Sequence, residues 1–215
     1  MLTDWQPKLL AIAVAQPHGD GAHDLNHLHR VWANARSLMR AQADGAADPL
    51  VVMAACYLHD LVNLPKNHPQ RASASRLSGA AARTGLQDAG FPAGRLDGVV
   101  HAIEAHSFSA AIGATTLEAK IVQDADRLDG LGAVGLARLF YIAGQMSSAL
   151  ADGADPLALQ RPLDDRRYAL DHIMVKLSKL PAMMQTDAGR ALGEQRLARL
   201  MAFRQEFAAE WTDAA

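Results

Sequence analysis

One stretch of the 215-residue sequence constrains the chain more than any other. Residues 49–58 read PLVVMAACYL, which is apolar on every face of a helix, and His59 and Asp60 follow directly. Burying an unpaired carboxylate costs far more free energy than one ordinary contact returns. We therefore expect a cation to satisfy this histidine and aspartate at the end of a buried helix, because its charge reverses the cost of burial.

The composition predicts an all-α protein. Half of the residues are hydrophobic and only 5% are aromatic. Alanine and leucine, which favour helices, dominate the apolar share. Helical periodicity recurs along most of the chain, and we find no convincing run of the strict alternation that is typical of strands. We expect one compact domain over residues 1–215.

Charge and cysteine content limit the ligands and the compartment. The formal net charge is −2, and the sequence lacks the basic stripe that binding along a nucleic-acid backbone needs. The single cysteine, Cys56, excludes an intrachain disulfide and a thiolate metal cage, and it suits a reducing compartment. The first apolar run is too short to span a bilayer. We expect a cytoplasmic protein that binds neither nucleic-acid polymers nor membranes.

A second predicted helix brings another histidine toward the core. Asp24 is typical of an N-cap, and the apolar positions that follow it keep the spacing of three and four residues. At 100° per residue, His27 lies on the shoulder of the apolar face and His29 points away from it. Asp24 is either a cap alone or a cap that also orients a histidine, and the sequence leaves both interpretations open.

The segment IVQDADRLDGLG, residues 121–132, adds three carboxylates. Asp126 and Asp129 share one flank of the predicted helix, whereas Asp124 points elsewhere and is expected to be a surface charge. Helix geometry alone does not choose between Asp126 and Asp129 as a ligand. The glycines in DGLGAVG predict a bend or close packing at residues 130–135.

Three motifs occur in a defined order: HDLNHLHRV at 23–31, YLHDLVNLPKN at 57–67 and DADRLDGLG at 124–132. They resemble the successive H, HD and D motifs of the HD superfamily of metal-dependent phosphohydrolases. Within it, the chain is most similar to the small stand-alone bacterial branch of YedJ-like and YpgQ-like proteins. The resemblance implies a compact HD-type helical bundle, with a metal-site core at about 23–146 and C-terminal helices at 164–212 completing the domain.

The resemblance also implies a ligand set. It matches the family's metal ligands to His27, His59, Asp60 and Asp126, the last because ADRL at 125–128 resembles the corresponding segment of stringent-response nucleotide hydrolases. Two imidazoles and two carboxylates suit Mn²⁺, Fe²⁺ or Mg²⁺, and Zn²⁺ is possible. The alternative is a metal-free network of histidine and aspartate in the core.

Hydrolysis of a small phosphorylated metabolite, most simply a nucleotide, is the activity that the resemblance implies, with release of pyrophosphate from a nucleoside triphosphate. Lys66, His68 and Arg71 in PKNHPQR would then bind phosphoryl oxygens, or they form only a solvated basic loop. His101 and His106 lie about 140° apart on a straight helix. Some HD enzymes hold a second metal ion with histidines from this part of the chain, but these two could reach one ion together only across a bend or a helix end. We therefore expect a single ion, with His106 reaching the substrate.

The group that accepts the proton is open. Asn63 stands where the deoxynucleotidase branch has an acidic residue, and asparagine orients water but cannot act as a base. With Asp60 at the metal, the candidates are hydroxide on the metal, Asp129 and Glu104. Three other functions stay open: a phosphomonoesterase, a phosphodiesterase, or a nucleotide-binding regulator without turnover. A homodimer is possible, and the connection 147–165 has no assigned role, although a lid is one interpretation.

Overall fold

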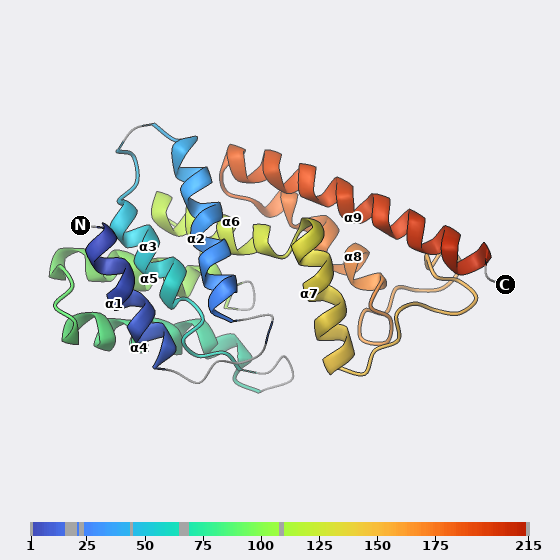
Figure 1. Cartoon of the computed structure of the whole chain (residues 1–215), viewed down its shortest axis with the longest axis horizontal. Coiled ribbons are helices and arrows are strands. Elements are labelled where there is room, and N and C mark those ends of the chain that lie inside the picture. The colour runs from blue at the N-terminus through green and yellow to red at the C-terminus, as the bar shows by residue number, and fades with distance from the viewer. Residues whose placement is uncertain are drawn as a thin grey trace. The chain divides into compact units, whose positions relative to one another are not determined.

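The computed structural model describes residues 2–15, 21, 24–43, 45–64, 69–107 and 110–213. These residues form an all-α structure, as predicted: they contain nine α-helices and no strand, only an isolated bridge between Ala149 and Tyr168. The helices, drawn in Figure 1, are α1 Leu2–Val14, α2 Leu25–Arg40, α3 Pro49–Leu58, α4 Ala74–Asp88, α5 Leu96–His106, α6 Leu117–Asp129, α7 Gly132–Gln145, α8 Asp171–Val175 and α9 Asp187–Asp213. Short 3-10 turns lie at Arg71–Ser73, Ala93–Arg95, Leu177–Lys179 and Pro181–Met183.

Two compact units make up the chain, Met1–Asp126 and Arg127–Ala215. The first unit contains α1 to α5 and most of α6, and the second begins within the last turn of α6 and contains α7 to α9. The expectation of one domain over residues 1–215 stays a prediction.

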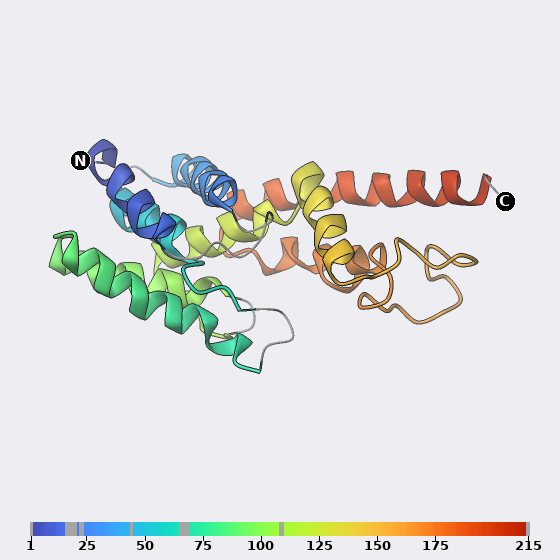
Figure 2. The same cartoon turned by 60° about the horizontal axis from the view of Figure 1, so that its bottom comes forward.

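Helix α3 is the centre of the first unit. It contacts α1, α2, α4 and α5, and Figure 2 shows it enclosed among these helices. Nine of its ten residues are buried, as its uniformly apolar sequence predicts. Asp48 caps the helix by accepting a hydrogen bond from the backbone N–H of Leu50, and it also pairs with Arg95. Pro49 occupies the first turn, where its missing N–H costs nothing. The cap fixes where α3 begins, and the burial of nearly all its residues fixes its place in the core.

The α6–α7 turn in the second unit depends on glycine. Gly132 has φ +71°, a left-handed conformation that favours glycine. A Cβ added at Gly135 would lie 2.2 Å from the carbonyl carbon and oxygen of Gly130, so no side chain fits there. The prediction of a bend with close packing at these glycines is confirmed.

The rest of the second unit packs α7 on α9. Phe140 of α7 contacts Phe203 and Phe207 of α9 through their rings. The connection 147–165 is tied to the same unit, because Arg161 pairs with the fully buried Asp171 through both of its terminal nitrogens. These contacts give no support to the lid interpretation. No helix among the described residues is both long and apolar enough to cross a membrane.

Candidate metal centre

Four side chains that lie far apart in the sequence meet in the first unit. The Nε2 atoms of His27, in the first turn of α2, and His59, just after α3, are 3.2 Å apart. Oδ2 of Asp60 lies 3.7 Å from the first nitrogen and 3.6 Å from the second. Oδ1 of Asp126, on α6, lies 3.6 Å and 3.8 Å from the same two atoms. The structure thus brings together all four residues that the sequence predicts as ligands.

The cluster is closed on one side and open on the other. The side chains of His27 and His59 are buried, with 1% and 0% exposure. The carboxylates of Asp60 and Asp126 retain 19% and 28% exposure. The imidazoles therefore form the floor of the site, and the carboxylates lie where water or a ligand can reach.

A hydrogen bond to the end of its own helix fixes the tautomer of His59. The Nδ1 atom lies 2.9 Å from the carbonyl oxygen of Cys56, in the last turn of α3. Carbonyls in that turn lack intrahelical donors, and a carbonyl oxygen only accepts. Nδ1 therefore carries the proton, so the neutral ring presents a lone pair on Nε2 to the cluster.

His106 repeats this arrangement at the end of α5. Its Nδ1 donates to the carbonyl of Ile103, and its Nε2 lies 3.7 Å from Oδ1 of Asp60. Burial and then the neighbouring His59 lower the pKa of His106, and these effects outweigh the opposing attraction of Asp60 and Asp126. With its proton on Nδ1, the neutral ring faces Asp60 with a lone pair on Nε2. His101 turns elsewhere, since its Nε2 accepts hydrogen bonds from the backbone N–H and hydroxyl of Thr115.

Acceptor atoms dominate the cluster. Burial tends to raise the pKa of Asp126, but the attraction of His59, His27 and His106 outweighs it, so that the pKa lies below its ordinary value. Burial, followed by the charge of Asp126, raises the pKa of the Cys56 thiol, which keeps its proton. Carboxylate oxygens and an imidazole lone pair gathered this closely would be stabilised by a shared positive charge.

The separations suit a divalent ion. Ligands at right angles on an ion with bonds of about 2.1 Å lie about 3 Å apart, and opposite ligands lie about 4 Å apart. The 3.2 Å between the two nitrogens and the 3.6–3.8 Å between nitrogen and oxygen fall within that range. The ligand atoms of His27, His59 and Asp60 all lie within 4.8 Å of one another. These three residues therefore fit a metal ion, and Asp126, which lies near both histidines, would join them after a shift of its side chain.

Other predicted site residues have varied positions. Lys66 and His68 lie outside the described residues, and of Arg71 only the backbone is described, in a 3-10 turn. Asn63 is partly exposed three residues after Asp60. Glu104 packs against Gly79, where an added Cβ would lie 3.1 Å from its Cγ, and no contact in the described part of the chain joins it to the cluster.

The two other aspartates of α6 are buried. Asp129, 2% exposed, pairs with Arg138 of α7 in the second unit. Asp124 is fully buried, so the prediction that it is a surface charge is wrong. The helical-wheel argument used only the apolar residues of α6 itself, so it took no account of neighbours such as α2 and α5, which bind α6 through Asn34 and Ala105.

The described contacts of Asp24 are those of a helix cap alone. Its carboxylate accepts hydrogen bonds from the backbone N–H of His27 and from the side chain of Asn26. Burial opposes the effect, but these donors lower its pKa. The N-cap is confirmed. The cap fixes the backbone of His27, although it does not touch the imidazole in any described contact.

Sequence reasoning missed three supporting side chains. Ser78 on α4 accepts a hydrogen bond from the backbone N–H of Val62 and so holds the segment after Asp60. Asn34 and Gln123 are buried amides that bind the carbonyls of Ala125 and Ala105. One signal was available in the sequence: Asn34 follows His27 by seven residues, which places this polar residue on the same flank of the helix as His27.

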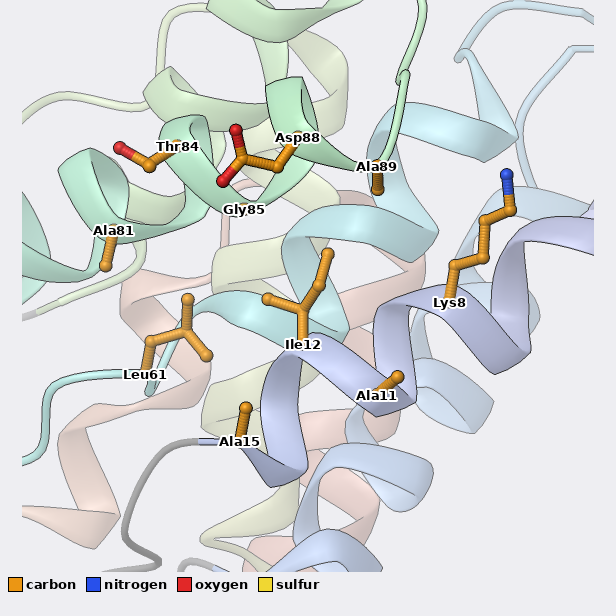
Figure 3. Close-up of a pocket in the computed structure, with 10 residues that line it drawn as sticks. All are labelled: Lys8, Ala11, Ile12, Ala15, Leu61, Ala81, Thr84, Gly85, Asp88 and Ala89. Carbon is orange, nitrogen blue, oxygen red and sulfur yellow. The ribbon is translucent and has the colours of Figure 1, made fainter.

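An open hollow of about 820 Å³ lies elsewhere in the first unit, between α1 and α4. Figure 3 shows small and apolar side chains along it, with Lys8 and Asp88 as its charged groups. Leu61 lines it, but none of the four clustered residues does. We do not assign the reaction to this hollow.

Comparison with known proteins shows the family of the chain. The HD domain family matches residues 24–131. Protein YpgQ of Bacillus subtilis is 33% identical over 178 residues, which cover 81% of this chain and 77% of YpgQ. The crystal structure of YpgQ in complex with ADP is similar with a TM-score of 0.71 and 30% identity, covering 94% of this chain and 97% of that one. An HD-superfamily hydrolase from Bacillus thuringiensis gives a TM-score of 0.74 at 27% identity and covers 99% of both chains.

Proposed function

Because the chain belongs to the HD domain family, we propose that it is a metal-dependent phosphohydrolase that cleaves a nucleoside triphosphate to the monophosphate and pyrophosphate. The observation that carries the proposal is the convergence of His27, His59, Asp60 and Asp126 with ligand-like separations. The ADP bound to the related YpgQ supports a nucleotide as the substrate class.

Each clustered residue has a proposed task. His27 and His59 hold a divalent ion from the buried side, and Asp60 and Asp126 hold it from the exposed side. When bound, such an ion activates water and offsets negative charge on a phosphoryl oxygen. Mn²⁺, Fe²⁺ and Mg²⁺ are the proposed ions, and Zn²⁺ remains an alternative.

His106 has a modified role in this proposal. A neutral ring with a lone pair on Nε2 accepts a proton or binds a metal, but it does not supply positive charge to a phosphate. We propose that it accepts a hydrogen bond from the attacking water or from a substrate hydroxyl. Lys66, His68 and Arg71 remain the proposed cations for the phosphates, with Asn63 orienting water.

Asp129 and Glu104 differ as candidates for the proton acceptor. Asp129 already pairs with Arg138, which favours its ionised form and gives it a structural task. Glu104 is partly exposed and packs on α4. Of the two side chains, Glu104 is the one without an ion pair among the described residues, so a Glu104→Gln variant is the more informative test of general-base catalysis.

A product analysis tests the function. The protein is stripped with a chelator, reloaded with Mn²⁺, Fe²⁺, Mg²⁺ or Zn²⁺, and incubated with ribonucleoside and deoxyribonucleoside triphosphates while ³¹P NMR follows the products. We expect pyrophosphate and nucleoside monophosphate in equal amounts. Orthophosphate with the diphosphate, or with a nucleoside, would indicate a different phosphohydrolase.

The second candidate is a regulator that binds nucleotide and metal without turnover, and Asn63 in place of an acidic residue is the feature that favours it. Equilibrium binding of a triphosphate in the presence of Mn²⁺, with no hydrolysis over hours, would identify the regulator. In that case Asp126→Ala would abolish nucleotide binding, and neither the wild type nor the variant would hydrolyse the nucleotide.

A further inference from the structure

We infer that Gln123 and Asn34 are positioning residues, two buried amides that hold α6, and with it Asp126, in register with α5 and α2 for metal binding. The inference rests on the proposed metal centre. Both amides lie in the first unit, and they donate to the carbonyls of the residues that immediately precede His106 and Asp126.

Gln123 joins α6 to the end of α5. Its Nε2 donates to the carbonyl oxygen of Ala105 at 2.6 Å. Ala105 lies in the last turn of α5, where carbonyls lack intrahelical donors, and His106 is the next residue. Gln123 itself precedes Asp126 by three residues on α6. One side chain therefore links the backbone that carries His106 to the helix that carries Asp126.

Asn34 provides the matching link from α2. Its Nδ2 donates to the carbonyl oxygen of Ala125 at 3.0 Å, one residue before Asp126. Seven residues are nearly two helical turns, so Asn34 lies on the same side of α2 as His27. The distance between the imidazole of His27 and the carboxylate of Asp126 is thus set by a hydrogen bond between their own helices.

Gln123 is a poor choice for stability alone. Its Oε1 is buried and has no hydrogen-bond partner among the described residues. An unsatisfied buried acceptor destabilises the folded state, and an apolar side chain of similar size avoids that cost. Gln123 therefore makes the folded state less stable than an apolar residue would, but it supplies a hydrogen-bond donor to Ala105. This pattern is expected of a functional residue.

Outer groups that orient metal ligands typically change metal affinity or activity by about 10–100-fold when they are removed. Gln123→Met keeps the size of the side chain and removes the donor, and Asn34→Leu does the same on α2. Gln87→Met, at an exposed position of α4, is the matched control. Each protein is stripped of metal and titrated with Mn²⁺ alone in a calorimeter, at a temperature where circular dichroism shows it folded. Thermal unfolding of the metal-free forms is recorded in parallel.

We expect Mn²⁺ affinity to fall about 10–100-fold in both site variants and to stay unchanged in the control. The metal-free Gln123→Met variant should unfold at the same temperature as the wild type or higher. If the hydrolysis is established, kcat should fall while KM changes little, because the ligands rather than the substrate contacts have moved.

Wild-type Mn²⁺ affinity in both variants would overturn the inference and leave the proposed function standing. A Gln123→Met variant that unfolds at a clearly lower temperature would show that the glutamine serves the fold, and this too would overturn it. Failure of the wild type to bind any of the four metals would refute the proposed function, and the inference would fall with it.

Discussion

The carboxylate of Asp60 faces His106 as well as the histidine pair, with its Oδ1 3.7 Å from Nε2 of His106. Its other oxygen, Oδ2, is the one near His27 and His59. The two sides of one carboxylate thus contact different imidazoles. His106 is therefore adjacent to the cluster without sharing its centre, which supports the expectation of a single ion.

Replacement of His106 tests the number of ions. We expect one ion per wild-type chain, and one ion still bound by His106→Ala, with affinity within about tenfold because Nε2 of this ring lies near Oδ1 of Asp60, the oxygen that faces away from the histidine pair. Metal content by mass spectrometry of the loaded proteins measures this. Two ions in the wild type and one in the variant would make the single-ion prediction wrong.

Replacement of His59 should abolish metal binding. The His59→Ala variant loses a buried ligand atom and leaves the Cys56 carbonyl without its donor. We expect Mn²⁺ affinity and the rate of hydrolysis to fall by more than about 100-fold, which is a larger loss than removal of a group that only orients a ligand typically causes. His29→Ala is the control, since His29 is exposed and contacts Tyr57. Equal losses in both variants would contradict the proposed ligand.

Asp126 and Asp129 should separate into different roles. Asp126→Asn should abolish metal binding, because an amide replaces the charged ligand oxygen. Asp129→Asn should keep metal binding but lose about 3 kcal/mol of unfolding free energy, because Arg138 is left without its buried partner. Metal titration and urea unfolding of both variants distinguish them. Metal loss in Asp129→Asn at full stability would reverse the assignment.

The glycine pair in α7 makes a matched test of the α6–α7 turn. Gly135→Ala should destabilise the protein by at least about 3 kcal/mol, because the new Cβ would collide with the backbone of Gly130. Gly144→Ala meets no atom within 4 Å and should stabilise the helix by up to about 1 kcal/mol. Urea denaturation measures both. Similar stability in the two variants would contradict the close packing of the turn.

Asp152 predicts a pH dependence in the second unit. The hydroxyl of Tyr168 and the backbone N–H groups of Asp155 and Ala154 lower its pKa from 3.8 to about 2. Because this pKa is lower in the folded state, the stability from Asp152 is full above pH 3.8 and is lost as the pH falls toward 2. The stability difference between wild type and Asp152→Asn should therefore shrink across that range in urea unfolding. A constant difference would contradict the shift.

Much of the fold and the site followed from local pattern. The apolar run of α3, the proline in its first turn and the cap at Asp24 are local features, so the sequence predicted them correctly. The order of the three motifs identified the four clustered residues through resemblance to a family. Helix geometry alone had left Asp126 and Asp129 equivalent.

The contacts between helices could not be predicted in the same way. The burial of Asp124 and the direction of Glu104 depend on which helices pack around α5 and α6, and a single helical wheel holds no such information. The amides of Asn34 and Gln123 carry no family motif, so their partners emerge only when the helices are packed. Lys66 and His68 stay predictions from the sequence.

His59 and His106 each donate from Nδ1 to a carbonyl in the last turn of a helix, α3 for His59 and α5 for His106. Folding therefore aims both rings before an ion arrives, and little conformational entropy remains to be lost on loading. Chelation should then be readily reversible, with the empty and filled protein differing by side-chain shifts rather than by refolding. A site prepared in this way can exchange one divalent ion for another, so the metal it carries in the cell would follow supply as much as selectivity.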